Sequence, residues 1–355
     1  MKINKNFWKG KKIFLTGHTG FKGSWFIILL EMLGAKVYGY SLKAEKKSLF
    51  HLANLKKLTK NSTIGDIRDF NKLKKAIKKC KPDFVVHMAA QSLVKTSYLR
   101  TKYTYEVNTI GTLNILEILN QLNTIKKALI ITTDKVYENN GKKIFYKELD
   151  RLGGIDPYSN SKACAELIVQ SFNQSFFKQK KIQVATARSG NVIGGGDYSS
   201  NRIIPDYFKS FFHNKKLLIR NPHFVRPWQH VIEPLYGYLL ILQRLQKNKY
   251  NKNNNWNFGP KKNNNKKVFE IINLLNMKFN NAVKIYIKNK NKNHYESKNL
   301  MLNSSKAKKY LAWNPKLSIS QSLDLIVDWY KSTKNNKNHL NACKEQIKNY
   351  FNYLI

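Results

Sequence analysis

Short apolar runs alternate with longer amphipathic stretches along the first half of the chain. The apolar runs predict buried strands, and the stretches between them have the apolar spacing of helices. The predicted strands cover residues 13–15, 36–40, 63–64, 84–87, 128–132 and 183–187, and the predicted helices cover residues 24–33, 70–79, 101–122 and 158–177. Because strands and helices that alternate in this way form βαβ units, the sequence predicts an α/β fold with a parallel sheet.

The pattern becomes irregular after Arg188, where three consecutive glycines and several prolines interrupt the alternation. Residues 234–246 and 256–258 again have the character of a helix and a strand. We therefore expect a first domain at residues 1–188, with residues 225–258 returning to it. Residues 189–224 and 259–355 are expected to form a smaller C-terminal α/β domain that binds a substrate.

The 355 residues carry a formal net charge of +43, and 42% of them are hydrophobic, which is too high a share for a disordered chain. The charge suggests nucleic-acid binding. However, the lysines are spread among many Asn and Ile residues, and no RNA-binding aromatic strand or helix-turn-helix accompanies them. We expect no nucleic-acid partner, although a basic surface attracts anionic small molecules. The densest lysine runs, 261–267 and 288–292, are expected to be exposed loops.

Cysteine usage and the hydrophobic runs indicate where the protein acts. Cys80, Cys164 and Cys343 are scattered and indicate reduced thiols in a cytoplasmic protein. The apolar run from Trp25 to Leu30 is far too short to cross a bilayer, so no membrane partner is expected. No Cys or His spacing typical of a metal site occurs, and no metal is predicted.

A glycine-rich segment lies between the first predicted strand and the first predicted helix. The pattern Gly-x-x-Gly-x-x-Gly permits a tight turn and lets the backbone approach a pyrophosphate at a helix N-terminus. Its place directly after the first strand makes a weak pattern specific. It predicts a dinucleotide-binding loop made of Gly17, Thr19, Gly20, Phe21, Lys22 and Gly23.

The second strand does not end in the acidic residue that commonly binds the ribose of NAD. Ser41 stands there and can bond to a ribose hydroxyl, whereas Lys43 can tolerate a 2′-phosphate. The residues alone therefore leave NAD and NADP open. After the third strand, Asp66 is placed to accept a hydrogen bond from the adenine amine and Ile67 to pack on the ring, while Asp69 fits better as a helix N-cap.

Small and polar residues end the fourth strand. Ala89 and Ala90 let a cofactor lie against the backbone, and Gln91 and Ser92 follow them. His87 is expected to be a buried core residue.

Tyr158 and Lys162 lie four residues apart, and therefore on one face of a predicted helix. Asp156 and Pro157 are expected at its N-cap and first turn. An ammonium near a phenol lowers the pKa of the tyrosine. Such a pair can therefore take a proton from a substrate hydroxyl.

Together these motifs resemble the extended short-chain dehydrogenase/reductase family, in its nucleotide-sugar branch. The resemblance rests on Thr16-Gly-x-x-Gly-Phe-x-Gly, His87-x-Ala-Ala-Gln, Val107-Asn108-Thr109-x-Gly111-Thr112, Thr133 and Tyr158-x-x-x-Lys162, and it extends from about Lys12 to Trp313. It implies a Rossmann-type doubly wound parallel sheet, bound NAD with Asn108 at the cofactor site, and a catalytic triad of Thr133, Tyr158 and Lys162. It also implies a homodimer paired through helices 101–122 and 158–177.

Several longer stretches resemble the 4,6-dehydratases of that branch. They are Thr16 to Trp25, Thr133 to Glu138, Leu152 to Ser159, Gly190 to Asp197 and Arg226 to Val231. The resemblance implies transient oxidation at C4 of a nucleotide sugar, loss of the C5 proton with the C6 hydroxyl, and reduction at C6. CDP-glucose is the expected substrate, in deoxysugar biosynthesis for lipopolysaccharide O-antigen.

Elimination needs an acid and a base beyond Tyr158. Many dehydratases of the family have Asp-Glu directly after the triad threonine, whereas this chain has Asp134-Lys135. Asp134 is expected to be the acid toward the C6 hydroxyl, which requires burial to raise its pKa. Lys135 is expected either to be the C5 base or to stabilise an enolate.

Contacts with the substrate are expected mainly from polar and cationic residues. Guanidinium groups bind phosphate oxygens in bidentate fashion. The expected contacts are Ser92, Asn191, Arg202, Arg220 and above all Arg226, with His294 and Tyr295 bordering the nucleotide. Two alternatives stay open: another nucleotide-sugar 4,6-dehydratase or a 4-epimerase of the same family, and a basic nucleic-acid-binding protein on a Rossmann scaffold.

Overall fold

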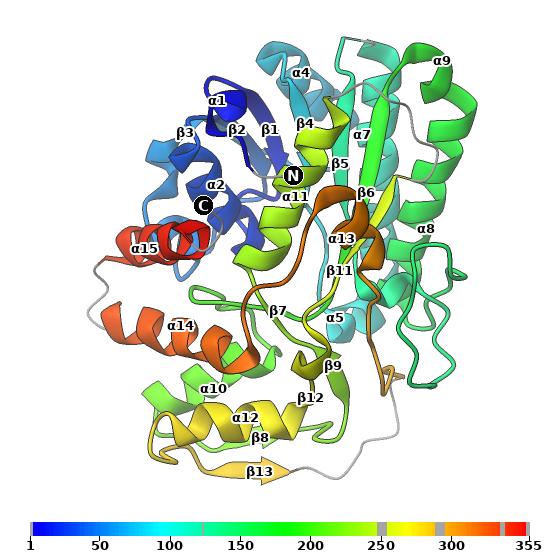
Figure 1. Cartoon of the computed structure of the whole chain (residues 1–355). Helices are drawn as coiled ribbons and strands as arrows, with labels where there is room; N and C mark the ends of the chain where they lie inside the picture. The colour runs from blue at the N-terminus through cyan, green and yellow to red at the C-terminus, as the bar shows by residue number, and fades with distance from the viewer. Residues whose placement is uncertain (1–2, 123, 247–253, 288–294, 334–337, 353–355) are drawn as a thin grey trace.

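A seven-stranded parallel sheet forms the centre of the computed structural model, which describes residues 3–122, 124–246, 254–287, 295–333 and 338–352 (Figure 1). The strands follow the order β3-β2-β1-β4-β5-β6-β11. Their bounds are β1 Lys12–Thr16, β2 Lys36–Ser41, β3 Thr59–Ile64, β4 Phe84–His87, β5 Lys127–Ile131, β6 Gln183–Ser189 and β11 Asn255–Phe258. The predicted doubly wound parallel sheet is therefore confirmed.

Both faces of the central strands are buried, because successive residues of β1, β4, β5 and β6 point into two different cores. In β1, Ile13 and Leu15 join the core that holds α2 (Phe21–Met32) and α11 (Ile232–Leu245). Phe14 joins the other core, under α4 (Phe70–Cys80), α7 (Gly111–Leu122) and α8 (Pro157–Phe172). Strands buried on both faces read as continuous apolar runs, which is the pattern that the sequence shows.

Two of the predicted helices contain a wider turn. The stretch predicted as one helix at 101–122 consists of α6 (Thr101–Tyr105), a π-helical turn η2 (Glu106–Ile110) and α7. The helix predicted at 158–177 is α8 followed by a second π-helical turn, η4 (Asn173–Phe177), and α9 (Lys178–Lys180). Such turns occur frequently at functional sites, and the first of these two carries Asn108.

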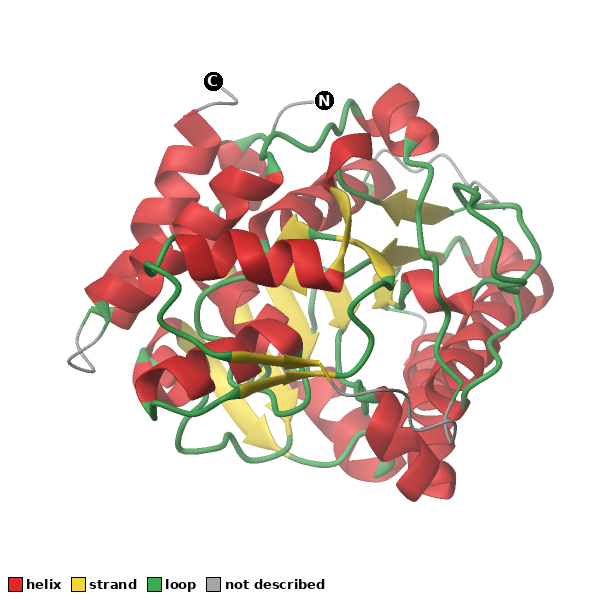
Figure 2. Ribbon diagram, turned by 90° about the horizontal axis from the view of Figure 1, so that it is seen from below, coloured by secondary structure: helices red, strands yellow, loops and turns green. Residues whose placement is uncertain are grey.

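The C-terminal half adds shorter elements at the carboxyl ends of the strands, on the side from which Figure 2 is seen. Three two-stranded pairs lie there: β7 with β10, β8 with β13, and β9 with β12. The remaining bounds are α1 Lys5–Trp8, α3 Leu49–Leu52, η1 Leu55–Leu58, α5 Val94–Leu99, η3 Asp134–Val136, β7 Val192–Ile193, α10 Ile203–Phe212, β8 Leu217–Ile219, β9 Val225–Pro227, β10 Gln229–His230, η5 Lys262–Asn264, β12 Asn265–Lys267, α12 Val268–Met277, β13 Ile285–Ile287, α13 Ser305–Leu311, α14 Ile319–Ser332 and α15 His339–Asn352.

One lysine run was wrongly expected to be an exposed loop. Residues 261–267 form η5 and β12, and β12 pairs antiparallel with β9. Asn264 is buried, and its amide donates to the Leu317 carbonyl. The buried contact of this segment is therefore made by Asn264, which lies between the lysines in the sequence. The other run, 288–292, lies outside the described residues.

The segments after residue 188 contribute to both halves of the molecule. The helix α11 packs on the main sheet, and β11 pairs with β6. The C-terminal helix α15, which the sequence division places with the substrate segments, packs against α2. Among the described residues, no helix is both long and apolar enough to cross a membrane.

A fully buried ion pair connects α8 to β6. The Arg188 guanidinium donates to both Glu166 oxygens, at 2.9 and 2.8 Å, and neither side chain is exposed. Thr132 and Thr186 also donate to the Glu166 carboxylate. These bonds satisfy a charge that would otherwise be costly to bury.

Replacing Glu166 by Ala should destabilise the fold by roughly 3–5 kcal/mol, because it leaves the buried Arg188 charge uncompensated. Urea unfolding measures the difference. Glu138→Ala is the matched control, because its ion pair with Arg151 is exposed and worth about 0–1 kcal/mol. Equal losses in both variants would contradict the assigned role of the buried pair.

Candidate functional site

A large cavity opens at the carboxyl ends of the central strands, between the sheet and the C-terminal elements. Its volume is about 1670 Å³. Pockets for one small ligand have roughly 300–1,000 Å³, so this cavity has room for two ligands side by side. Ten basic side chains line it against four acidic ones, which favours anionic ligands. The basic residues are Lys22, Lys95, Lys135, Lys142, Lys162, Arg202, Lys209, Arg220, Arg226 and Lys298.

The glycine loop has the geometry of a nucleotide-binding turn. Gly17 has a φ of +71°, and a Cβ atom there would lie 2.6 Å from the Ala89 nitrogen. A Cβ at Gly23 would lie 2.3 Å from the Gly17 carbonyl oxygen. No side chain caps α2 at Gly20, so the helix N-terminus is open to a phosphate. Only glycine fits at Gly17 and Gly23.

The residues predicted to contact the ribose and adenine lie at and after the ends of β2 and β3. Thr19 Oγ1 lies 2.8 Å from Ser41 Oγ, so the two hydroxyls hold each other at the end of β2. Asp66 already accepts from Arg68, whose Nη2 lies 2.8 Å from its Oδ2. The pKa of Asp66 is lowered mainly by this hydrogen bond. An adenine amine would have to share the carboxylate with Arg68, and Ile67 lies buried beside it.

Asn108 joins the loop after β4 to α8. Its side-chain oxygen accepts from the Gln91 backbone at 2.9 Å, and its amide donates to the Gln91 carbonyl and to Ser161 Oγ, each at 3.0 Å. The Gln91 side chain continues this network to Thr104. Asn108 therefore orders the loop that carries Ala89 and Ala90, rather than facing the cavity itself.

His87 is the buried core residue that the sequence predicts. Its Nδ1 lies 2.7 Å from Thr16 Oγ1, and burial lowers its pKa to about 3. The imidazole therefore stays neutral and does not act as an acid at ordinary pH.

Tyr158 and Lys162 lie in the first turns of α8, where the predicted caps are confirmed. Asp156 accepts from the Ser159 backbone at 2.9 Å, and Pro157 opens the helix. Lys162 donates to the Ile131 carbonyl at 3.1 Å, at the end of β5. Burial lowers the pKa of Lys162 to about 8.

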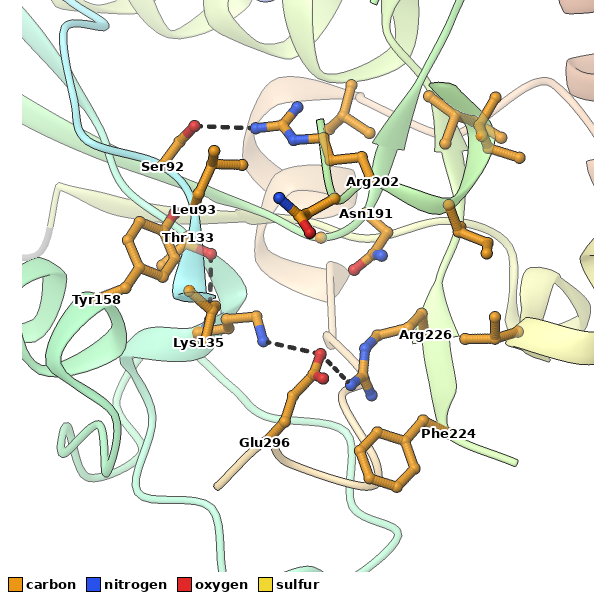
Figure 3. A pocket seen from close by; sticks show the side chains of 18 of the residues that line it. Ser92, Leu93, Thr133, Lys135, Tyr158, Asn191, Arg202, Phe224, Arg226 and Glu296 are labelled. Atoms are coloured by element: carbon orange, nitrogen blue, oxygen red, sulfur yellow. Dashed lines mark hydrogen bonds and ion pairs between the residues drawn. The ribbon is translucent and has the colours of Figure 1, made fainter. Parts of the chain in front are cut away.

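Burial raises the pKa of Tyr158 to about 12, and two influences oppose that rise. They are a hydrogen bond with Thr133 and the charge of Arg202. Thr133 is buried at the end of β5, and its hydroxyl donates to Asp134 Oδ1 at 3.0 Å. Thr133 and Tyr158 therefore lie together at one corner of the cavity (Figure 3), and Lys162, the third residue of the predicted triad, lines the same cavity.

Burial of Asp134 favours the protonated form of its carboxyl group. It is 3% exposed, and burial raises its pKa against the opposing charge of Lys135. Its Oδ2 atom is buried and has no hydrogen-bond partner in the described part of the chain. An unpaired buried oxygen is costly, so it is suited to bond with a ligand.

Lys135 faces a glutamate that the sequence analysis did not identify. Its Nζ lies 3.7 Å from Glu296 Oε1, and the same oxygen accepts from Arg226 Nη2 at 2.8 Å (Figure 3). Asn221 donates to the other oxygen at 3.0 Å. The two cations lower the pKa of Glu296 to about 2 against the effect of burial. A lone glutamate in a Lys- and Asn-rich stretch gives no sequence signal.

The other expected substrate residues also line the cavity. Arg202 Nη1 lies 3.1 Å from Asp197 Oδ2, and its Nη2 donates to Ser92 Oγ at 3.0 Å. Arg220 is exposed, and its charge lowers the pKa of Asp206 against the larger effect of burial. Asn191 and Tyr295 line the same space, whereas His294 lies outside the described residues.

Lys22, in the glycine loop, donates to Ser189 Oγ at 3.2 Å, and burial lowers the pKa of Lys22 to about 7.

The residues present fit a bound dinucleotide. The glycine turn lets the backbone approach closely at Gly17 and Gly23, and no side chain caps the N-terminus of α2. Within the described ranges, no three His, Cys, Asp or Glu side chains gather as metal ligands.

Comparisons with known proteins agree on one family. The profile of the GDP-mannose 4,6 dehydratase family matches residues 14–326. The chain is 43% identical to the CDP-glucose 4,6-dehydratase of Salmonella typhimurium, over 98% of both chains. It is 30% identical to the human dTDP-D-glucose 4,6-dehydratase, over 66% of each chain.

Solved structures show the same fold. The dTDP-glucose 4,6-dehydratase of Bacillus anthracis, in complex with NAD, has a TM-score of 0.77 and 24% identity, and the match covers 93% of this chain and all of that one. The UDP-glucose 4-epimerase of Thermotoga maritima, with UDP-glucose, has a TM-score of 0.78 and 22% identity, over 91% and 99% of the two chains.

Replacing Lys162 by Met should stabilise the fold at pH 7 by roughly 3 kcal/mol, the cost of lowering its pKa from 10.5 to about 8. The unfolded chain binds this proton more tightly, so the cost is present below pH 8 and is relieved as the pH rises toward 10.5. Urea unfolding between pH 7 and 10 measures the gain and its decline. Lys102→Met is the control, because that side chain is 92% exposed. A loss of stability in Lys162→Met at pH 7 would contradict the prediction.

Proposed function

Since this chain belongs to the GDP-mannose 4,6 dehydratase family, we propose that it converts CDP-glucose into CDP-4-keto-6-deoxyglucose and water. The observation that carries the proposal is the buried, unpaired Asp134 oxygen beside the Thr133–Tyr158 pair. A 4-epimerase needs only the proton acceptor, whereas a dehydratase also needs an acid for the departing hydroxyl. The 43% identity to the Salmonella CDP-glucose enzyme supports the choice of nucleotide.

NAD is the proposed cofactor, and when bound it would accept a hydride from sugar C4 and supply it to C6, as C5 regains a proton. The chain's own residues handle the protons. Tyr158 accepts the proton of the 4-hydroxyl; burial raises its pKa to about 12, and Thr133 and the charge of Arg202 oppose that rise. Lys162 holds its ammonium at the end of β5 and fixes the position of this corner.

Asp134 would act in the elimination. The 4-ketone acidifies the C5 proton, and loss of that proton drives out the C6 hydroxyl. Burial raises the pKa of Asp134 and so favours a protonated carboxyl group, and Asp134 would give this proton to the departing hydroxyl so that water leaves. Lys135, 13% exposed and next in the chain, either removes the C5 proton or stabilises the enolate.

We further propose a cytoplasmic homodimer that acts in deoxysugar biosynthesis for O-antigen. The helices expected to pair carry exposed apolar side chains, namely Ile110, Leu167 and Phe176. Exposed apolar residues on neighbouring helices favour burial against a second copy. We propose no nucleic-acid or membrane partner and no metal.

Mass spectrometry of products from CDP-, dTDP-, GDP- and UDP-glucose tests the proposed function. We expect loss of one water from CDP-glucose, without net reduction of NAD. Dehydration of another nucleotide sugar alone would change the substrate but keep the reaction class. A C4 epimer as the sole product would refute the dehydratase.

Replacing Lys135 by Ala should slow water loss by roughly 10²–10⁴-fold while still permitting oxidation at C4. Absorbance of the reduced nicotinamide should therefore rise and persist after CDP-glucose is added. Tyr158→Phe is the matched control, and it should bind NAD without any such absorbance. Full dehydration by Lys135→Ala would remove Lys135 from the elimination step.

A further inference from the structure

Two of the three arginines in the cavity form an ion pair with a carboxylate, and these two carboxylates differ in exposure. Asp197, the partner of Arg202, has a side chain that is 5% exposed. The Glu296 side chain is 34% exposed, although the Arg226 that it binds is only 4% exposed. Glu296 therefore reaches from the open side of the cavity onto a buried cation.

Glu296 also binds two cations at once. Its Oε1 lies 2.8 Å from Arg226 Nη2 and 3.7 Å from Lys135 Nζ, and Asn221 donates to its Oε2 at 3.0 Å. Two cations and an amide donor around one anion are the surroundings that a phosphate group prefers. Figure 3 shows the Glu296 side chain pointing between Lys135 and Arg226 from a loop.

Arg226 has contacts that do not involve the Glu296 side chain. It donates its Nη1 to the carbonyls of Val225 and Lys298, at 2.9 and 3.2 Å. The backbone next to Glu296 is also held, because Tyr98 donates to the Tyr295 carbonyl at 3.1 Å. We therefore expect the glutamate to withdraw by rotation of its side chain, with Arg226 staying in place.

We propose that the Glu296 carboxylate occupies the subsite of an anionic group of the substrate, and that the diphosphate of the nucleotide sugar displaces it from Arg226 and Lys135. This inference rests on the proposed function for its ligand. The glutamate keeps the buried Arg226 charge paired in the free protein. The glutamate also selects among ligands, because only a ligand with enough negative charge can replace its carboxylate.

Displacement has a consequence for Lys135. Once Glu296 withdraws, the nearest anion to the ammonium is the ligand's own phosphate or a developing enolate. A sugar without its diphosphate would leave Glu296 in place and Lys135 engaged. The glutamate therefore couples recognition of the diphosphate to release of a residue beside Asp134.

Calorimetric titration of the full chain with CDP tests the proposal, using Glu296→Gln. Glutamine keeps the size of the side chain but removes the competing charge. Because close charge pairs are strongly coupled, CDP should bind about tenfold more tightly or better to the variant. Cytidine, which has no phosphate, should bind equally to both proteins. Glu138→Gln is the control for a general gain of positive charge, because its ion pair lies on the surface.

Weaker or unchanged CDP binding by Glu296→Gln would overturn the proposal, because it would mean that the glutamate holds Arg226 in place for the ligand. Tighter binding in the Glu138→Gln control as well would overturn it too. The variant leaves Arg226 unpaired and should melt at a lower temperature than the natural protein, with a larger rise on adding CDP. That comparison remains decisive if the variant is only marginally folded.

Inorganic pyrophosphate separates this inference from the proposed function. It should bind more tightly to Glu296→Gln even if the protein turns over a different nucleotide sugar. Dehydration of CDP-glucose together with no gain in pyrophosphate or CDP affinity would leave the proposed function intact and remove the role of Glu296.

Discussion

The buried Glu166–Arg188 ion pair fixes the relation between α8 and the sheet. Glu166 lies one turn after Lys162 and accepts hydrogen bonds from Thr132 on the β5 side and from Thr186 in β6. Three elements therefore share one carboxylate. The corner at which Tyr158, Lys162 and Thr133 meet depends on this arrangement, because a small shift of α8 would separate the side chains that must act on one hydroxyl.

Electrostatics in the cavity follow from the same burial. Excess positive charge suits two diphosphates, but buried cations are costly without partners. Burial lowers the pKa of Lys22 and of Lys162, and neighbouring cations add to the effect at Lys22. A few carboxylates in different surroundings offset this cost. Burial raises the pKa of Asp134, whereas the cations around Glu296 lower its pKa. These surroundings favour the protonated form of one carboxyl group and the charged form of the other.

Much of the site could be predicted because its signals are local. Gly17 and Gly23 stand where a Cβ would collide with backbone, and Asp156 and Pro157 open α8 as their residue types require. Contacts between distant segments could not be predicted in this way. Arg226 is an example: its type and place suggest a phosphate contact, but its partner Glu296 lies 70 residues away in a stretch without apolar periodicity.

The sequence by itself determined the parallel sheet, the nucleotide loop and the identity of the residues gathered around Tyr158. These follow from apolar periodicity and from short motifs whose members are covalently close. Only the tertiary structure decided which charges meet: that Arg68 engages Asp66, that Asn108 orders a loop, and that Glu296 bridges Lys135 and Arg226. The strength of a charge pair depends on the distance between the two groups and on their burial, and the spacing of residues along the chain predicts neither.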